Sequence, residues 1–185
     1  MAEIERRTKR YPTDLTDEEW ARIEPVLPRP ARTGRRRQVD LREVMNAIRY
    51  LARIGCGWRM LPKDFPPYST VQRYFHAWRD HGLLQTIRFA LIMETRELEG
   101  HEARPTAGVI DSQSTRTNES VGVRGGDAGK KINGRKHHVV VDTIGLPFGL
   151  VVHAADIEDR DGAPTVLASI RRSCPLLRHI SADAG

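Results

Sequence analysis

Apolar residues recur at helical spacing through the first half of the chain. In the segment 14–27, Thr16 is followed three residues later by Glu19. A threonine and a glutamate at this spacing form a capping box, which satisfies the free amide groups at the start of a helix. The apolar residues of the segment share one helical face: Trp20, Ile23 and Leu27. This pattern predicts a first helix that Pro28 and Pro30 end.

The same spacing predicts three further helices. One covers residues 40–54, another starts at Ser69 or Thr70, and Gly82 separates that one from a helix over 83–98. The third helix has one strongly apolar face, which predicts its buried side: Val71, Tyr74, Phe75 and Trp78. Its polar residues then point outward: Gln72, Arg73, His76 and Arg79.

These outward residue types are those with which a recognition helix contacts base edges and phosphates. The second and third helices therefore resemble a helix-turn-helix with an enlarged turn. A plain helical bundle with a polar surface is the alternative, because sequence specifies helix-turn-helix geometry poorly.

The pattern changes after a polar segment, EGHEARP, over residues 99–105. Short β-branched or apolar runs then predict strands, and one longer amphipathic stretch predicts a helix. In chain order these elements are a strand at 107–111, a hairpin of strands at 137–142 and 148–154, a helix from Asp161 or Gly162 to about residue 173, and a strand at 177–182. The order fits a mixed sheet with a packed helix, as in the first half of a ribonuclease-H-like fold. We therefore expect an α+β chain with an all-α domain at 1–104 and a truncated ribonuclease-H-like domain at 105–185.

Composition narrows the class of protein. The 185 residues carry a net charge of +6, which favours an acidic partner such as nucleic acid, although an ordinary basic protein fits as well. Cys56 and Cys174 form no CxxC pair, so neither a zinc site nor a disulfide framework is indicated and a reducing cytoplasm is expected. No apolar run approaches the roughly 20 residues that span a bilayer, which argues against a membrane protein.

Two basic segments are candidates for contact with DNA phosphates. One lies within residues 29–37, which hold five arginines and no acid, and its candidates are Arg35, Arg36 and Arg37. The other is a glycine-rich stretch within 122–138, and its candidates are Arg124, Lys130, Lys131, Arg135 and Lys136. A solvated linker and a solvated loop are the respective alternatives.

Asp111 and Asp183 each follow a short apolar run, and such runs predict buried strands. Carboxylates fixed at strand ends suit hard divalent cations. Two such ions, roughly 3.5–4 Å apart, can activate an attacking oxygen and stabilise a leaving oxygen on phosphorus. A lone aspartate after an apolar run is also a common turn residue, so spacing alone does not decide between the two readings.

Three groups of motifs carry a family resemblance over nearly the whole chain. They are LTDEEWARIEPVLP with GCGWRMLPKDFPPYSTVQRYFHAW, VIDSQSTRT with GGDAGKKINGRKHHVVVDTIGLP, and VVHAADIEDRDGAPTVL with SADAG. With these motifs the chain resembles the DDE transposases of bacterial insertion sequences. The resemblance implies that Asp111 and Asp183 are the first and second catalytic and metal-binding aspartates. The third ligand of the family, a glutamate on a later helix, has no match in this sequence.

The resemblance also implies the activity and the partners. Such an enzyme binds terminal inverted repeats, cuts DNA with two Mg²⁺ ions (or Mn²⁺), and joins the freed 3′-hydroxyl to target DNA. Its partner is double-stranded DNA, on which it can act as a homo-oligomer, and its location is the bacterial cytoplasm, at the nucleoid. Because no third carboxylate is matched, a non-catalytic DNA-binding fragment that modulates transposition and a decayed fragment are the alternatives.

Overall fold

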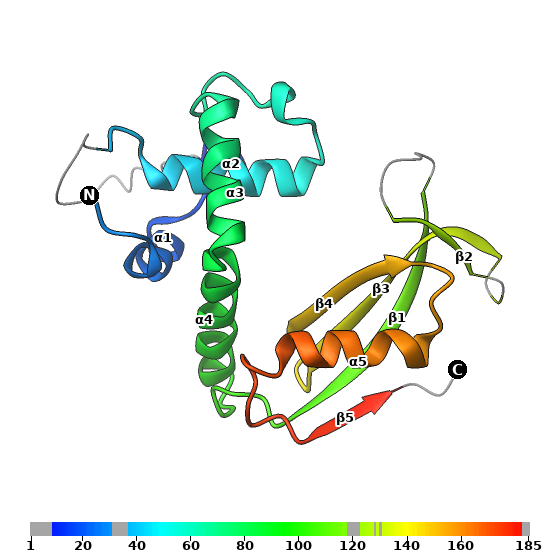
Figure 1. Cartoon of the computed structure of the whole chain (residues 1–185). Coiled ribbons are helices and arrows are strands. Elements are labelled where there is room, and N and C mark those ends of the chain that lie inside the picture. Colours follow the sequence, from blue (N-terminus) through cyan, green and yellow to red (C-terminus); the bar gives the residue numbers. More distant parts are fainter. Residues whose placement is uncertain (1–8, 31–36, 118–122, 128, 130, 183–185) are drawn as a thin grey trace, which may run out of the picture. The chain divides into compact units, whose positions relative to one another are not determined.

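Helices form the first part of the chain, and a sheet with one helix forms the second (Figure 1). The computed structural model describes residues 9–30, 37–117, 123–127, 129 and 131–182. The helical elements are α1 (Asp17–Ile23), η1 (Glu24–Val26), α2 (Leu41–Ile54), η2 (Trp58–Met60), α3 (Tyr68–Asp80), α4 (Leu83–Leu98) and α5 (Asp159–Ile170). The strands are β1 (Ala107–Arg116), β2 (Gly125–Asp127), β3 (Ile132–Asp142), β4 (Pro147–Ala154) and β5 (His179–Ala182). This α+β architecture is the one predicted.

Side-chain caps set the starts of the first two helices. The Thr16 hydroxyl accepts the Glu19 amide at 3.0 Å, and the Glu19 carboxylate accepts the Thr16 amide at 2.8 Å, which confirms the capping box. The hydrogen bond to Thr16 is the largest of the effects that lower the pKa of Glu19. Asp40 caps α2 by accepting the amide of Arg42 at 2.8 Å, and Gly55 ends that helix at a positive φ of 71°.

The N-terminal unit, Met1–Arg88, has its own core. Ala47 of α2, Val71 of α3 and Phe65 of the intervening loop are buried together. Tyr11 stacks on Phe65 with ring centroids 5.0 Å apart, and the guanidinium of Arg10 lies 4.4 Å from the Phe65 ring centroid. The aromatic residues of the loop therefore belong to the core, so that the long turn between α2 and α3 is a packed element.

The C-terminal unit, Phe89–Gly185, includes the last part of α4. Ile92 is buried in the core of this unit, and Phe89 packs against it. Because these side chains of α4 pack in the second core, the two compact units meet between Arg88 and Phe89. The polar segment in the sequence suggested a domain boundary between residues 104 and 105. Within the described residues, no helix is long and apolar enough to cross a membrane.

The sheet is mixed. β3 pairs antiparallel with β1 on one side and with β2 and β4 on the other, while β1 pairs parallel with β5. The helix α5 lies between β4 and β5 in the chain, as the sequence predicts. Parallel neighbours need such a crossover connection, and this one places β5 beside β1.

The two faces of the sheet differ in burial. The inner face packs against α5, with a core formed by Ile110, Val140, Phe148, Val166 and Ile170. The outer face exposes apolar side chains, such as Leu150 at 54%. Because side chains alternate along a strand, residues 107, 109, 111, 113 and 115 of β1 share the outer face.

Candidate metal and DNA-contact site

Asp111 lies in the middle of β1, not at its end. The sequence indicated a strand of residues 107–111, but β1 continues to Arg116 because residues 108–116 all pair with β3. The carboxylate of Asp111 is exposed on the outer face, and its Oδ1 accepts the amide of Ser112 at 2.7 Å. Asp111 is therefore an exposed carboxylate with one oxygen hydrogen-bonded to the next amide, which suits one ligand of a hard cation.

The neighbouring strand β5 brings the end of the described chain to Asp111. Ile110 pairs with Ala182 in parallel register. Asp183, the second expected ligand, follows Ala182 in the sequence and lies outside the described residues. Among the residues that the structure describes, no group of three or more histidine, cysteine or acidic side chains is arranged to hold a metal ion.

Polar side chains continue from Asp111 along the outer face. Gln113 and Thr115 follow on β1, and their partners across the sheet on β3 are His137 and Arg135. The other neighbours of Asp111 on the outer face, on β1, β3 and β4, are apolar: Val109, Val139, Val141, Leu150 and Val152. Asp111 thus stands at the border between a polar track and an apolar area. The alternation of side chains along β1 could have identified Gln113 and Thr115 as sharing the face of Asp111. Placing His137 there required the pairing register of β1 and β3.

The glycine-rich stretch is partly regular structure. The sequence indicated an irregular basic segment, whereas β1, β2 and β3 extend into it. Arg124 donates from Nε to Asn133 at 2.9 Å, and Arg135 donates from Nε to the Val123 carbonyl at 3.1 Å. Lys131 is exposed at a positive φ of 51°, and Lys130 lies outside the described residues.

Lys136 is not available to DNA. It is only 5% exposed on the inner face, where its Nζ lies 2.8 Å from Asp159 and 3.6 Å from Asp127. Burial lowers the pKa of Lys136, but the hydrogen bond and charge of Asp159, together with Asp127, outweigh it and hold the pKa above its usual value. Asp127 also accepts the hydroxyl of Ser114 at 2.7 Å. Lys136 therefore joins β2 and α5 to the sheet, and its buried position does not fit the predicted contact with DNA.

His137 and His138 point to opposite faces, as strand alternation predicts. His138 is 1% exposed under α5, with its ring 5.0 Å from that of His153. Burial lowers the pKa of His138, and His153 lowers it further. Gly162 of α5 lies directly against the ring, so that an added Cβ would come within 2.2 Å of it. His138 is accordingly a neutral core residue.

The outward residues of α3 divide into two kinds. Arg73 and Arg79 are exposed, whereas Gln72 and His76 are half-buried. His76 lies beside Phe75 and Trp58, with ring centroids 5.6 and 6.2 Å away, which differs from its expected position in solvent. A hydrogen bond between Arg79 and Asp80 at 2.7 Å raises the pKa of Arg79.

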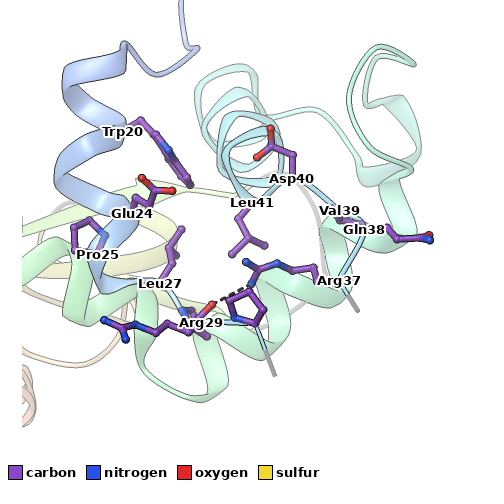
Figure 2. Close-up of a pocket in the computed structure, with 12 residues that line it drawn as sticks. Trp20, Glu24, Pro25, Leu27, Arg29, Arg37, Gln38, Val39, Asp40 and Leu41 are labelled. Carbon is purple, nitrogen blue, oxygen red and sulfur yellow. Dashed lines mark hydrogen bonds between the residues drawn. The ribbon is translucent and has the colours of Figure 1, made fainter. Parts of the chain in front are cut away.

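Only part of the basic arm is described. Arg35 and Arg36 lie outside the described residues. Arg37 is exposed and donates from Nη1 to the Pro28 carbonyl at 3.0 Å. Arg37 lines a pocket of about 590 Å³. Figure 2 shows it together with Leu27 and Leu41, which line the same pocket. This arginine is therefore held at the edge of the helical unit and remains open to solvent.

Two families of known proteins match parts of this chain. Residues 15–88 match the family described as "Putative transposase of IS4/5 family", and residues 102–185 match the "Transposase DDE domain". "Uncharacterized protein y4sN" of Sinorhizobium fredii is 30% identical over 80 residues, which are 43% of this chain. The match spans 64% of that relative's length, which is less than two thirds. No solved structure matches the chain.

Proposed function

Because the chain belongs to the DDE transposases of insertion sequences, we propose that it binds the terminal inverted repeats of its element and takes part in metal-dependent DNA cleavage and strand transfer. The observation that carries this proposal is the position of Asp111. Its carboxylate is exposed on the central strand β1, next to the parallel strand β5. The proposed location is the bacterial cytoplasm, at the nucleoid.

Asp111 and Asp183 are the proposed ligands of Mg²⁺ or Mn²⁺. Asp111 follows Ile110 and Asp183 follows Ala182, and Ile110 and Ala182 are paired. The place of Asp183 in the sequence, directly after the last paired residue of β5, supports it as the second ligand. Two bound ions supply activation of the attacking oxygen and charge stabilisation of the leaving oxygen. The part of Asp111 is to hold a cation on a rigid strand, with one carboxylate oxygen fixed by the Ser112 amide. We assign no residue to the third carboxylate.

The helical domain, residues 1–104, is the proposed DNA-binding part, and residues 105–185 are the proposed part of the catalytic domain. Arg73 and Arg79 are the exposed cations of α3 and would contact base edges or phosphates. Arg35, Arg36 and Arg37 would add phosphate contacts. Half-buried Gln72 and His76 would contact DNA through the edge that remains accessible.

Binding without cleavage is the second candidate function. The helical unit has its own buried core of Ala47, Phe65 and Val71, so DNA binding by this unit would not require the sheet. A chain that binds the element ends without cutting them would compete with an active transposase for that DNA. It could do so as a homo-oligomer on the DNA.

Fluorescence anisotropy with the full chain tests the proposal. The probes are a duplex that carries one terminal inverted repeat and a scrambled duplex of equal composition. We expect at least about tenfold tighter binding to the repeat, since specific and non-specific affinities differ by this much or more. Equal affinity for the two duplexes would exclude recognition of the element ends. Cleavage of the repeat with Mg²⁺ or Mn²⁺, and its loss in Asp111→Asn, then separates the enzyme from the binding protein.

A further inference from the structure

The polar track on the outer face offers a contact for DNA that the sequence did not suggest. We propose that His137, oriented by Thr115, binds a backbone phosphate next to the one positioned at Asp111. This inference rests on the proposed function, because it needs DNA at the outer face of the sheet. His137 is thus a positioning residue for the DNA strand.

The strand register places His137 beside Asp111. His137 is directly opposite Gln113, and Gln113 is two residues from Asp111 on the same strand. All three side chains therefore lie on the same face. Diagonal neighbours across an antiparallel pair are roughly 7–8 Å apart, so His137 is close enough to act on the same DNA strand without ligating the same metal ion.

Thr115 fixes the orientation of the imidazole. The hydroxyl of Thr115 donates towards the Arg135 carbonyl at 3.4 Å, and its oxygen lies 3.1 Å from Nδ1 of His137. The Thr115 oxygen therefore engages Nδ1 of His137, as acceptor or as donor according to the imidazole tautomer. The hydrogen bond at one ring nitrogen decides what the other can do, so Nε2 is the atom left to bind a ligand.

The charges on this face favour a phosphate at Nε2. Among the described strand residues that share the outer face, Asp111 is the only acid, and Arg135 adds a cation beside His137. An N–H at Nε2 of His137 can donate to a phosphate oxygen. His138 cannot take this part, because it is buried under α5.

The apolar side chains beside Asp111 restrict where the DNA strand can lie on the sheet. Val139 of β3 pairs with Asp111 of β1 and with Leu150 of β4. Across the strands, Asp111 is therefore followed by apolar side chains. The row that holds His137 has polar Gln113 on one side. Phosphates therefore find polar partners along β1 and the adjoining half of β3, and not across the sheet towards β4.

Methylphosphonate substitution provides the test. A series of repeat duplexes is prepared, each with one phosphate near the cleavage position made neutral, and binding to the full chain is measured with Ca²⁺. For the wild-type protein we expect neutralisation of one phosphate adjacent to the scissile one to weaken binding roughly fivefold, as for an exposed ion pair of about 1 kcal/mol. His137→Gln should lose the same factor and become insensitive to that same substitution, because the two changes remove one contact.

Two further variants make the result specific. Thr115→Val should show a smaller loss at the same phosphate, since it removes only the hydrogen bond that orients the ring. His179→Gln is the matched control, because His179 is exposed on the outer face of β5 and stands two rows from Asp111. It should keep the wild-type pattern.

The outcomes are distinguishable. If His137→Gln and phosphate neutralisation weaken DNA binding by independent factors at every phosphate tested, His137 contacts none of these phosphates. The inference is then overturned. The same follows if wild-type binding is insensitive to every substitution beside the cleavage position. If the wild-type protein does not distinguish the repeat from scrambled DNA, the proposed function fails first, and the inference fails with it.

Discussion

The guanidinium of Arg96 lies 2.5 Å from the carboxylate of Asp142, and both side chains are buried. Arg96 is in the last turn of α4 and Asp142 ends β3. The other oxygen of Asp142 accepts the amides of Ile144 and Leu146 at 3.0 and 2.8 Å. One carboxylate therefore joins α4 to the sheet and closes the β3–β4 turn.

Removal of one partner of this pair should strongly destabilise the C-terminal unit. Arg96→Met leaves a buried carboxylate without its cation, and the expected cost is about 3–5 kcal/mol of unfolding free energy. Urea unfolding of the full chain, followed by circular dichroism, measures it. Arg79→Met is the matched control, since the Arg79–Asp80 pair is exposed and its loss should change stability little. Equal effects of the two variants would contradict the account.

Close packing of α5 on the sheet predicts the effect of an added methyl group. A Cβ at Gly149 would lie 2.8 Å from Cγ2 of Ile170 and 3.2 Å from Cβ of Val140. Gly149→Ala should therefore cost about 1–3 kcal/mol through overpacking. Gly126→Ala is the control, because nothing lies within 4 Å of its added Cβ. Unfolding midpoints compare the two variants, and an unchanged midpoint for Gly149→Ala would show that the core has room.

The buried imidazole of His138 predicts loss of stability in acid. Its pKa is lowered in the folded state, so the unfolded chain binds more protons below about pH 6.5. The contribution of neutral His138 to the free energy of unfolding is complete above that pH. It declines as the pH falls towards the folded-state pKa. The charged and titratable neighbours are Lys136, His153 and Asp159, and only Asp159 favours the protonated form.

Unfolding free energies between pH 8 and pH 5 measure this effect. The His138→Gln variant should lose less stability on acidification than the wild-type protein, and the exposed His179→Gln should follow the wild type. Identical slopes for wild type and His138→Gln would show that His138 is not the group responsible.

Arg73, one of the two exposed arginines of α3, predicts a specific loss of DNA binding. Arg73→Gln should weaken binding to the inverted repeat by about 1–3 kcal/mol if Arg73 contacts a base, with a smaller effect on scrambled DNA. Arg53→Gln is the control, because Arg53 is exposed at the end of α2 and belongs to no candidate site. An equal loss for both variants would indicate a general effect of charge. Anisotropy at several salt concentrations separates base contacts from phosphate contacts.

Local patterns predicted the helices and most of the sheet. The capping box at Thr16, the cap at Asp40 and the glycine at 82 set boundaries through interactions within a few residues, which a sequence shows directly. The strand β1 was predicted too short, because its polar second half is ordered by pairing with β3. That pairing is a long-range contact, and no local pattern of residues 112–116 shows it.

The candidate site was predictable only in part. A short apolar run ending in an aspartate indicated Asp111, but the sequence could not show which lysines are buried. Lys136 looks like any other cation of its segment, and only the approach of Asp127 and Asp159 in space removes it from the surface. The pair of Arg96 and Asp142 was not predicted for the same reason, because 46 residues separate its members.

Iron-mediated backbone cleavage tests the central claim, that Asp111 holds a metal ion, most directly. The full chain with repeat DNA is loaded with Fe²⁺ in place of Mg²⁺ and treated with ascorbate and peroxide, and the sites of polypeptide cleavage are mapped by mass spectrometry. The account predicts cuts close to residue 111 and close to residue 182, which excess Mg²⁺ suppresses and Asp111→Asn abolishes. Cuts at other positions only, or an unchanged pattern in Asp111→Asn, would contradict it.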